Sequence, residues 1–307
     1  MKEYISYYYN LDVYDINDNQ DYYSFFYNNF EYIFTYYNRT EEELNDLLKV
    51  ISELKYKNVL VHEIIFNIFN SPLSKVGDIN YILLKVISPK EEYDIVRIND
   101  FNNLLTLNNE SSKLYRLNWG TLWSTKVDYI EEQVSKLGKD KKIILDTLGY
   151  YIGLAENAIS YVNRCESLYK EYGAKICLSH RRIFYPNLSN NYLNPLSFIF
   201  DLSVRDISEY IKVIFFSGED ALIELSTYLK ICRLNIYEYH MLYARLLYPS
   251  YYFDIYEHIM NDNESEDKLM PIIEKCDKYE LFLKQAYYEI TKYVNLDKID
   301  WLIKKEL

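Results

Sequence analysis

Glycine is scarce in this chain, and its placement excludes one kind of nucleotide site. Only seven of the 307 residues are glycine, and the first is Gly77. Protein kinases fold a glycine-rich loop over the phosphates of ATP, between the first two strands of their sheet. No such loop can form before Gly77. The segment where it would fall, Asn17-Asp18-Asn19-Gln20, is acidic and would repel a triphosphate.

Basic residues are equally rare at this end of the chain. Lys2 is the only lysine between Met1 and Leu48. In kinases the third strand supplies a lysine that pairs with the phosphates and with a helix glutamate. The corresponding segment here, Phe30 to Tyr36, reads FEYIFTY and has none. The whole chain has a formal net charge of −12, so a nucleic-acid-binding surface of clustered Lys and Arg is not expected.

The sequence also lacks the features of membrane, secreted and zinc-binding proteins. No run of eighteen apolar residues exists, so no membrane span is predicted. The first residues, MKEYISYYYN, lack the features of a signal peptide, and a cytoplasmic protein is predicted. The four cysteines form no C-x-x-C pair, and the four histidines show no metal-ligand spacing. Reduced thiols and no zinc site are therefore expected.

The order of elements resembles that of a kinase N-lobe. Aromatic and polar residues alternate between turn residues, which predicts strands near 4–14, 22–27 and 30–36. Thr40 and Glu43 form a capping box that begins a helix. Two further strands are predicted at 61–69 and 81–87. Residues 1–88 are accordingly predicted to be an N-lobe with a five-stranded sheet and one helix, followed by a hinge at 88–90.

Residues 89–307 are predicted to be a helical C-lobe. Apolar residues recur at helical spacing in successive segments, and helices are expected at 116–136, 142–169, 206–217, 221–232, 236–247, 253–260 and 268–294. The fold class is therefore α+β, bilobal and protein-kinase-like, with a small antiparallel sheet and a large helical lobe.

One stretch of the C-lobe, residues 175–212, resembles the floor of a kinase active site. A short buried strand is expected at 176–178, and a second apolar run, 196–200, ends on Asp201. In kinases the loop between these two segments has the sequence motif H-R-D-x-x-x-x-N. His180 and Asn187 keep that spacing, but Arg182 stands where the catalytic Asp should be. Asp201 falls at the position of the metal-binding Asp of D-F-G.

Each of these residues has a functional and a structural interpretation. His180 orients the loop by hydrogen bonds or is a histidine satisfied at a strand end, and the two roles are compatible. Asn187 and Asp201 could hold a divalent cation through oxygen ligands. The alternative, which is favoured, makes Asn187 a turn residue and Asp201 a helix cap.

The charged residues of the same stretch are expected to form ion pairs. Arg182 could contact a phosphate, but a buried pair with Asp201 or Asp206 is favoured because Arg binds carboxylates with two parallel hydrogen bonds. Arg205 and Asp206 are predicted to form a local ion-pair network that positions the following helix.

Several runs of sequence resemble a known family. They are LNWGTLWSTKVDY at 117–129, YYIGLAENAI at 150–159, SHRR at 179–182, Asp201 with VRDISEY at 204–210, and ARLLYPSYYFD at 244–254. These runs are similar to the spore-coat CotS/YutH-like proteins, a divergent branch of the aminoglycoside phosphotransferase and choline kinase superfamily. The resemblance implies a bilobal kinase-like fold and, in spore formers, association with the coat. Members with an intact catalytic loop would phosphorylate a substrate, whereas here Arg182 occupies the Asp position.

The sequence therefore predicts a pseudokinase-like binding or scaffold protein with a degenerate nucleotide site. Its predicted partner is a protein, with spore-coat components as candidates, and no cofactor is expected. The alternative is an unconventional phosphotransferase that binds ATP with Mg²⁺ and acts on a small molecule or protein. Asp201 or Asp206 would then bind the metal or act as the catalytic base. A purely structural coat component is a third hypothesis.

Overall fold

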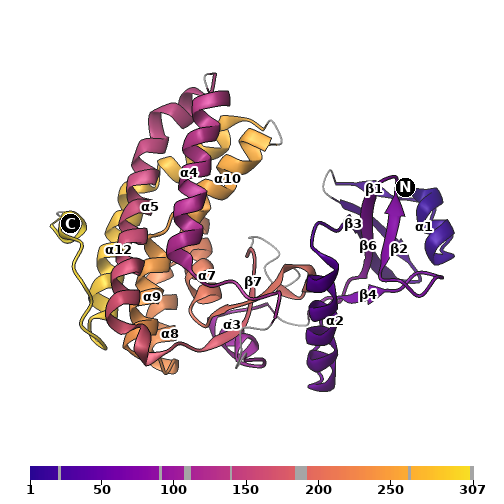
Figure 1. Ribbon diagram of the computed structural model, residues 1–307, viewed down its shortest axis with the longest axis horizontal. Helices are drawn as coiled ribbons and strands as arrows, with labels where there is room; N and C mark the ends of the chain where they lie inside the picture. Colours follow the sequence, from indigo (N-terminus) through magenta and orange to yellow (C-terminus); the bar gives the residue numbers. More distant parts are fainter. Residues whose placement is uncertain are drawn as a thin grey trace. The chain divides into compact units, whose positions relative to one another are not determined.

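The computed structural model describes residues 1–19, 22–89, 92–106, 112–138, 140–183, 192–261 and 264–304. Contacts along the chain divide it into two compact units (Figure 1). The sheet unit consists of residues 1–93, 109–115 and 186–199, and the helical unit of residues 94–108, 116–185 and 200–307. The boundary predicted after residue 88 stays a prediction.

The sheet unit contains an antiparallel sheet whose strands differ in length. Its strands are β1 (Asn17–Asp18), β2 (Tyr22–Tyr27), β3 (Phe30–Tyr36), β4 (Glu63–Ile65), β5 (Leu73–Val76) and β6 (Ile79–Lys85). They lie in the order β1-β2-β3-β6-β4, and β5 pairs with β6 beyond the end of β4. The two predicted strands 22–27 and 30–36 match β2 and β3.

The strand predicted at 61–69 is shorter than expected, since only Glu63–Ile65 forms β4. The Asn67 side chain is the physical reason. Its Oδ1 accepts hydrogen bonds from the backbone N–H groups of Phe69, at 3.0 Å, and Ser71, at 3.1 Å. An Asn that binds the backbone two residues further on closes a turn in place of continuing a ladder. A separate strand, β5, then begins at Leu73.

The prediction of a strand at 4–14 is wrong, because residues Lys2–Tyr9 form helix α1. Ile5 and Tyr9 are one helical turn apart, so both reach the same face of the sheet. They join a buried cluster with Phe25, Phe34 and Leu83. Asn10 ends the helix with φ of 53°, the left-handed conformation that Asn tolerates at helix ends. Burial of the Ile5–Tyr9 stripe outweighs the preference of tyrosine for strands.

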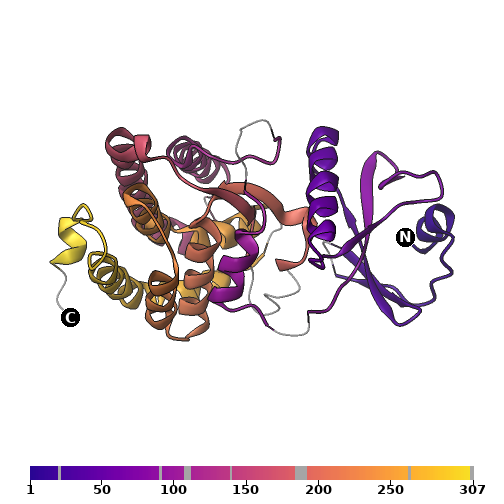
Figure 2. The ribbon, with the colours of Figure 1, turned by 90° about the horizontal axis from the view of Figure 1, so that it is seen from below.

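Helix α2 (Glu41–Tyr56) begins as predicted. The Thr40 hydroxyl accepts a hydrogen bond from the Glu43 N–H, and the Glu43 carboxylate accepts one from the Thr40 N–H, each at 3.1 Å. In both ribbon views α1 and α2 lie on opposite sides of the sheet (Figures 1 and 2). The sheet is therefore covered on both faces, which agrees with the complete burial of Ile82, Leu83 and Leu84 on β6.

The helical unit is built around long helices that run side by side (Figure 1). Its helices are α3 (Ile95–Asn102), α4 (Trp119–Leu137), α5 (Lys142–Tyr169), α7 (Arg205–Ser217), α8 (Ala221–Ile231), α9 (Ile236–Leu247), α10 (Ser250–Asn261), α11 (Met270–Ile273), α12 (Cys276–Ile290) and α13 (Asp300–Ile303), with 3₁₀ turns at Lys170–Tyr172 and Glu266–Leu269. Among the described residues, no helix is both long enough and apolar enough to cross a membrane.

The helix predicted at 268–294 is interrupted. Its first part is a 3₁₀ turn followed by the short helix α11, in which Pro271 stands in the first turn. Proline is tolerated there because the N–H groups of a first turn have no helical partner. The longer helix α12 begins only at Cys276. The predicted bounds of α5 and α9 match the structure.

A two-stranded sheet brings the candidate site together. Strand β7 (Ile176–His180) pairs with β8 (Phe198–Leu202), which follows a 3₁₀ turn at Pro195–Ser197. Helix α7 begins only three residues after β8, so His180 and Asp201 lie close to the first turn of that helix. This strand–strand–helix arrangement was predicted from residues 175–212.

Candidate functional site

His180 is held by Asp206 at the end of β7. The His180 backbone N–H donates to Asp206 Oδ1 at 3.0 Å, and its ring Nδ1 lies 2.7 Å from Asp206 Oδ2. Both side chains are fully buried. Because a carboxylate only accepts, Nδ1 carries the proton, and both oxygens of Asp206 are used to fix one residue. The structural role predicted for His180 describes this arrangement.

Asp201 is enclosed by three donors. Its Oδ1 accepts hydrogen bonds from Trp119 Nε1, at 2.9 Å, and from the Leu202 N–H, at 2.7 Å. Its Oδ2 accepts from Arg205 Nη1 at 2.7 Å. The residue is 0% exposed. Burial raises the pKa of Asp201, and Arg205 opposes that shift.

The alternative role proposed for Asp201, that of a helix cap, is wrong. The N-cap position of α7 is Val204, and no side chain caps the helix there. Asp201 lies three residues earlier, and its carboxylate accepts from the side chains of Trp119 and Arg205 and from the Leu202 N–H, not from the backbone N–H groups of α7.

Arg205 is the centre of this arrangement. Its Nε donates to the His180 carbonyl at 2.9 Å, and its Nη2 donates to the Arg181 carbonyl at 3.1 Å. The same guanidinium therefore binds the end of β7 and the Asp201 carboxylate. The predicted local network at Arg205 and Asp206 is present in modified form, since each pairs with a residue at a strand end and not with the other.

A second buried charge cluster follows one turn along α7. Glu209 Oε1 accepts from Lys212 Nζ at 2.8 Å and from Arg245 Nε at 2.6 Å, and Glu209 Oε2 accepts from the Ser250 hydroxyl at 2.8 Å. Burial acts to raise the pKa of Glu209, but Lys212 and Arg245 outweigh it and hold that pKa below its ordinary value. Burial lowers the pKa of Lys212 to about 8.

Stacked rings cover the cluster. Trp123 stacks on Tyr248, with centroids 4.2 Å apart, and on Trp119 at 5.4 Å. The Arg245 guanidinium lies 5.0 Å from the Trp119 ring centroid. These tryptophans were predicted to be core residues, and they are buried. Their role is to exclude water from the Asp201 and Glu209 carboxylates.

Arg182 does not form the buried pair that was predicted. Its Nη2 lies 2.9 Å from Asp254 Oδ1 and 3.5 Å from Glu257 Oε2, both on α10. Its side chain is 44% exposed. Asp201 and Asp206 are already bound by other partners and buried, so neither carboxylate is available to Arg182.

Asn187, the other predicted metal ligand, lies outside the described residues. Among the residues that are described, no group of three or more His, Cys, Asp or Glu could hold a metal ion. A carboxylate has about four acceptor sites, and Asp201 uses three of them, so a metal would share the enclosed carboxylate with Arg205, Trp119 and the Leu202 N–H. Whether Asp201 and Asn187 bind a cation therefore stays a prediction.

The sheet unit contains a residue that the sequence analysis missed. Arg39 follows β3, and its Nη1 donates to the carbonyls of Leu196, at 3.0 Å, and Phe198, at 2.9 Å. Its Nη2 lies 3.5 Å from Glu43 in the first turn of α2. A basic residue immediately before the Thr40 capping box was the available sequence signal.

The lysine of β6 does not replace the missing strand lysine. Lys85 Nζ lies over the Phe30 ring, 3.5 Å from its centroid, and 4.0 Å from Glu63 Oε2. Both partners belong to the same sheet.

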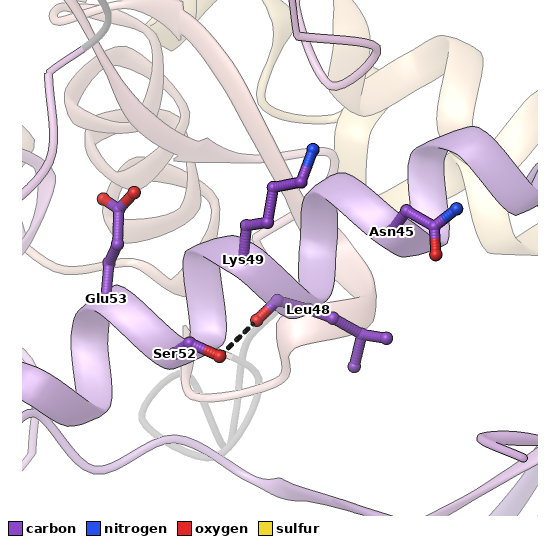
Figure 3. Close-up of a pocket in the computed structure, with 5 residues that line it drawn as sticks. All are labelled: Asn45, Leu48, Lys49, Ser52 and Glu53. Atoms are coloured by element: carbon purple, nitrogen blue, oxygen red, sulfur yellow. Dashed lines mark hydrogen bonds between the residues drawn. The ribbon is translucent and has the colours of Figure 1, made fainter.

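A separate hollow of about 660 Å³ on α2 is lined by Asn45, Leu48, Lys49, Ser52 and Glu53 (Figure 3). All five come from one helix, so no groups converge there from different elements.

Comparison with known proteins supplies the family. The sequence matches, over residues 2–286, the family described as "Spore coat putative kinase YutH". The chain belongs to the YutH spore-coat family. A curated relative, the endospore coat-associated protein YutH of Bacillus subtilis (strain 168), is 31% identical over 190 residues. That match covers 55% of this chain and 55% of the relative, about half of its length.

Solved structures show the fold of this YutH family member. An aminoglycoside phosphotransferase from Alicyclobacillus acidocaldarius has a TM-score of 0.63 at 11% identity, over 95% of this chain and 96% of the other. A spectinomycin phosphotransferase in its AMP-bound complex has a TM-score of 0.54 at 14% identity, over 93% and 96%. The predicted α+β, bilobal, kinase-like fold and the family resemblance are confirmed.

Proposed function

We propose that this YutH family member is a kinase-like binding protein that does not transfer phosphoryl groups and that associates with the spore coat through a protein partner. The observation that carries the proposal is the state of Asp201. A metal-binding carboxylate must present free oxygens to the cation. Both oxygens of Asp201 are instead bound by Trp119, Leu202 and Arg205, and the residue is fully buried.

Further features support the same proposal. Arg182 stands at the position of the catalytic Asp and pairs with Asp254 and Glu257 on α10. The first 76 residues contain no glycine, and β3 contains no lysine. The formal net charge of −12 disfavours phosphate-rich partners such as nucleic acids. The B. subtilis relative is named as coat-associated, which supports the spore coat as the place of action. A cytoplasmic state before that association stays part of the proposal.

A nucleotide titration tests the proposal directly. The melting temperature is measured with ATP, ADP and GTP, each with and without Mg²⁺ or Mn²⁺. A ligand present at about 100 times its dissociation constant adds about 2.7 kcal/mol of stability, which is easily observed. We expect no metal-dependent shift. A shift that requires the metal and is lost in Asp201→Asn would contradict the proposal.

The second candidate is a phosphotransferase, which the kinase-like family description favours. In that case phosphoryl transfer from ATP should disappear in Asp201→Ala and survive in Glu132→Ala, whose carboxylate pairs only with exposed Lys136 among the described ion pairs. The coat association is tested separately, with a fluorescent fusion expressed in sporulating B. subtilis. A signal that stays diffuse after the coat has assembled would count against it.

A further inference from the structure

The helical unit contains a hollow of about 260 Å³ at the end of β7 opposite His180. It is lined by residues from α3, from the C-terminal end of α8, and from the backbone on either side of the β7–β8 pair. Lys175 precedes β7, Ser203 follows β8, and the Ser203 N–H donates to the Lys175 carbonyl at 3.0 Å. Figure 1 shows α3, α8 and β7 close together. The hollow is thus separate from the kinase-like loop.

One tyrosine at this hollow has a hydroxyl that can serve as a hydrogen-bond donor. Tyr228, on α8, is only 1% exposed and lines the hollow. Its hydroxyl makes no hydrogen bond to any residue that the structure describes. Burial raises its pKa well above the ordinary value, so the hydroxyl stays protonated and can donate. The residue is buried, but its hydroxyl is not one of the fully buried side-chain atoms that lack a partner, so it is free to donate to a group bound at the hollow.

Two cations border the same hollow. Arg233 follows α8 and forms no ion pair or hydrogen bond with any described residue. Lys175 Nζ donates to Asn103 Oδ1, also on the wall. Two positive side chains at one hollow stand out in a chain with a net charge of −12. They favour a negatively charged ligand.

The carboxylate of Glu238 also lines the hollow, but it is already bound. Its Oε1 accepts from the Lys175 N–H, at 2.8 Å, and from the Ser203 hydroxyl, at 3.3 Å. Its Oε2 accepts from the Asn235 N–H at 3.0 Å, which completes the capping box of α9. These donors, at a helix N-terminus, stabilise the Glu238 charge and leave Arg233 unpaired.

We propose that this hollow binds a small molecule with a carboxylate group, which Arg233 and Lys175 hold, and with an oxygen that accepts a hydrogen bond from the Tyr228 hydroxyl. Arg presents parallel donors that match a carboxylate. The volume lies just below the range of about 300–1,000 Å³ that drug-sized ligands occupy, so the ligand has the size of a small metabolite. The site is independent of Asp201 and of any nucleotide.

Succinate is the probe, titrated into the whole chain at constant ionic strength, with inorganic phosphate as a separate arm. We expect succinate to raise the melting temperature. Arg233→Gln and Tyr228→Phe should each weaken its binding at least tenfold. Lys230→Gln is the matched control, because it also removes one positive charge near the end of α8 but does not line the hollow. Its affinity should equal that of the unmodified chain.

Cysteine alkylation locates the binding. Cys232 lines the hollow and is partly exposed, and Cys276 is partly exposed elsewhere in the helical unit. Succinate should slow the reaction of iodoacetamide with Cys232 and leave that of Cys276 unchanged, as read by mass spectrometry. An unchanged Cys232 rate, equal affinity in Arg233→Gln, or binding of phosphate but not succinate would each overturn the assignment.

Discussion

The two units differ in how strongly their rings are exposed and in how many charges they bury. The sheet unit exposes large rings, among them Phe26, which is 71% exposed, and Phe69, and it buries few charges, chiefly Arg39 and Glu43. The helical unit exposes some rings, such as Tyr172, but it buries Trp119 and Tyr252, and its helix α7 carries two clusters of buried charge. The stability of the helical unit therefore depends on charges that satisfy one another, whereas the surface of the sheet unit is available to a partner.

The buried charges also bear on our proposal that this kinase-like fold does not transfer phosphoryl groups. In an active kinase, charged side chains on the catalytic loop and the third strand act on nucleotide and metal. Here the Asp201 carboxylate pairs with Arg205, and the Asp206 carboxylate pairs with His180. Buried ion pairs are often no better than apolar packing, but breaking one partner is costly. The clusters are therefore expected to be the most sensitive part of the molecule.

The largest effect is expected for Glu209→Ala. The substitution leaves the Lys212 and Arg245 charges buried without their shared carboxylate. Loss of one partner from a buried pair costs about 3–5 kcal/mol in unfolding free energy. Urea denaturation followed by circular dichroism measures the loss. Glu132→Ala, which removes an exposed pair with Lys136, should leave the midpoint unchanged. Equal midpoints for both variants would refute a special role for the buried cluster.

A smaller loss is expected for Arg39→Met in the sheet unit. Methionine keeps most of the side-chain volume but removes the donors to the Leu196 and Phe198 carbonyls and the pair with Glu43. Hydrogen bonds from a charged group contribute about 1.5–3 kcal/mol, and we expect a loss in that range. Lys49→Met, which removes an exposed lysine from α2, is the control. A loss equal to that of Glu209→Ala would show that the two units depend equally on buried charge.

Much of the fold could be predicted from the sequence because local signals and burial agree there. The Thr40–Glu43 capping box fixed the start of α2, and the apolar stripe of residues 142–169 fixed both ends of α5. Residues 4–14 failed because their tyrosines fit either a strand or a short helix. Only contact of Ile5 and Tyr9 with Phe25 and Phe34 on distant strands selects the helix.

The candidate site was predictable in position but not in pairing. The spacing of His180 and Asp201 placed both residues beside the first turn of α7. Their partners depend on side chains that converge only in three dimensions: Trp119 comes from α4, 82 residues before Asp201. The predicted pair of Arg182 with Asp201 failed for a local reason, since Arg205, four residues after Asp201, already binds the carboxylate.

The pH dependence of stability separates the two carboxylates of α7 and β8. The pKa of Glu209 lies below its ordinary value of 4.5, so its contribution is present above that pH and is lost as the pH falls further. The destabilisation caused by Glu209→Gln should therefore shrink below pH 4.5. Burial raises the pKa of Asp201, so its contribution is present at acid pH and is lost as the pH rises through that pKa. Asp201→Asn should show the opposite trend in urea unfolding between pH 3.5 and 7. Parallel curves for the two variants would contradict these environments.

The smallest effect on stability is expected for Phe26→Ser, on the surface of the sheet unit. Phe26 is exposed, whereas its neighbour Phe25 on the same strand is buried in the α1 cluster. Surface substitutions usually change unfolding free energy by no more than about 0.5 kcal/mol, while Phe25→Ala should cost about 3–5 kcal/mol. If the exposed rings serve binding, Phe26→Ser should keep its urea midpoint and still lose coat fluorescence in sporulating cells. Loss of stability together with fluorescence would instead assign Phe26 to the fold, and the contrast between the two units would then rest on the buried charges alone.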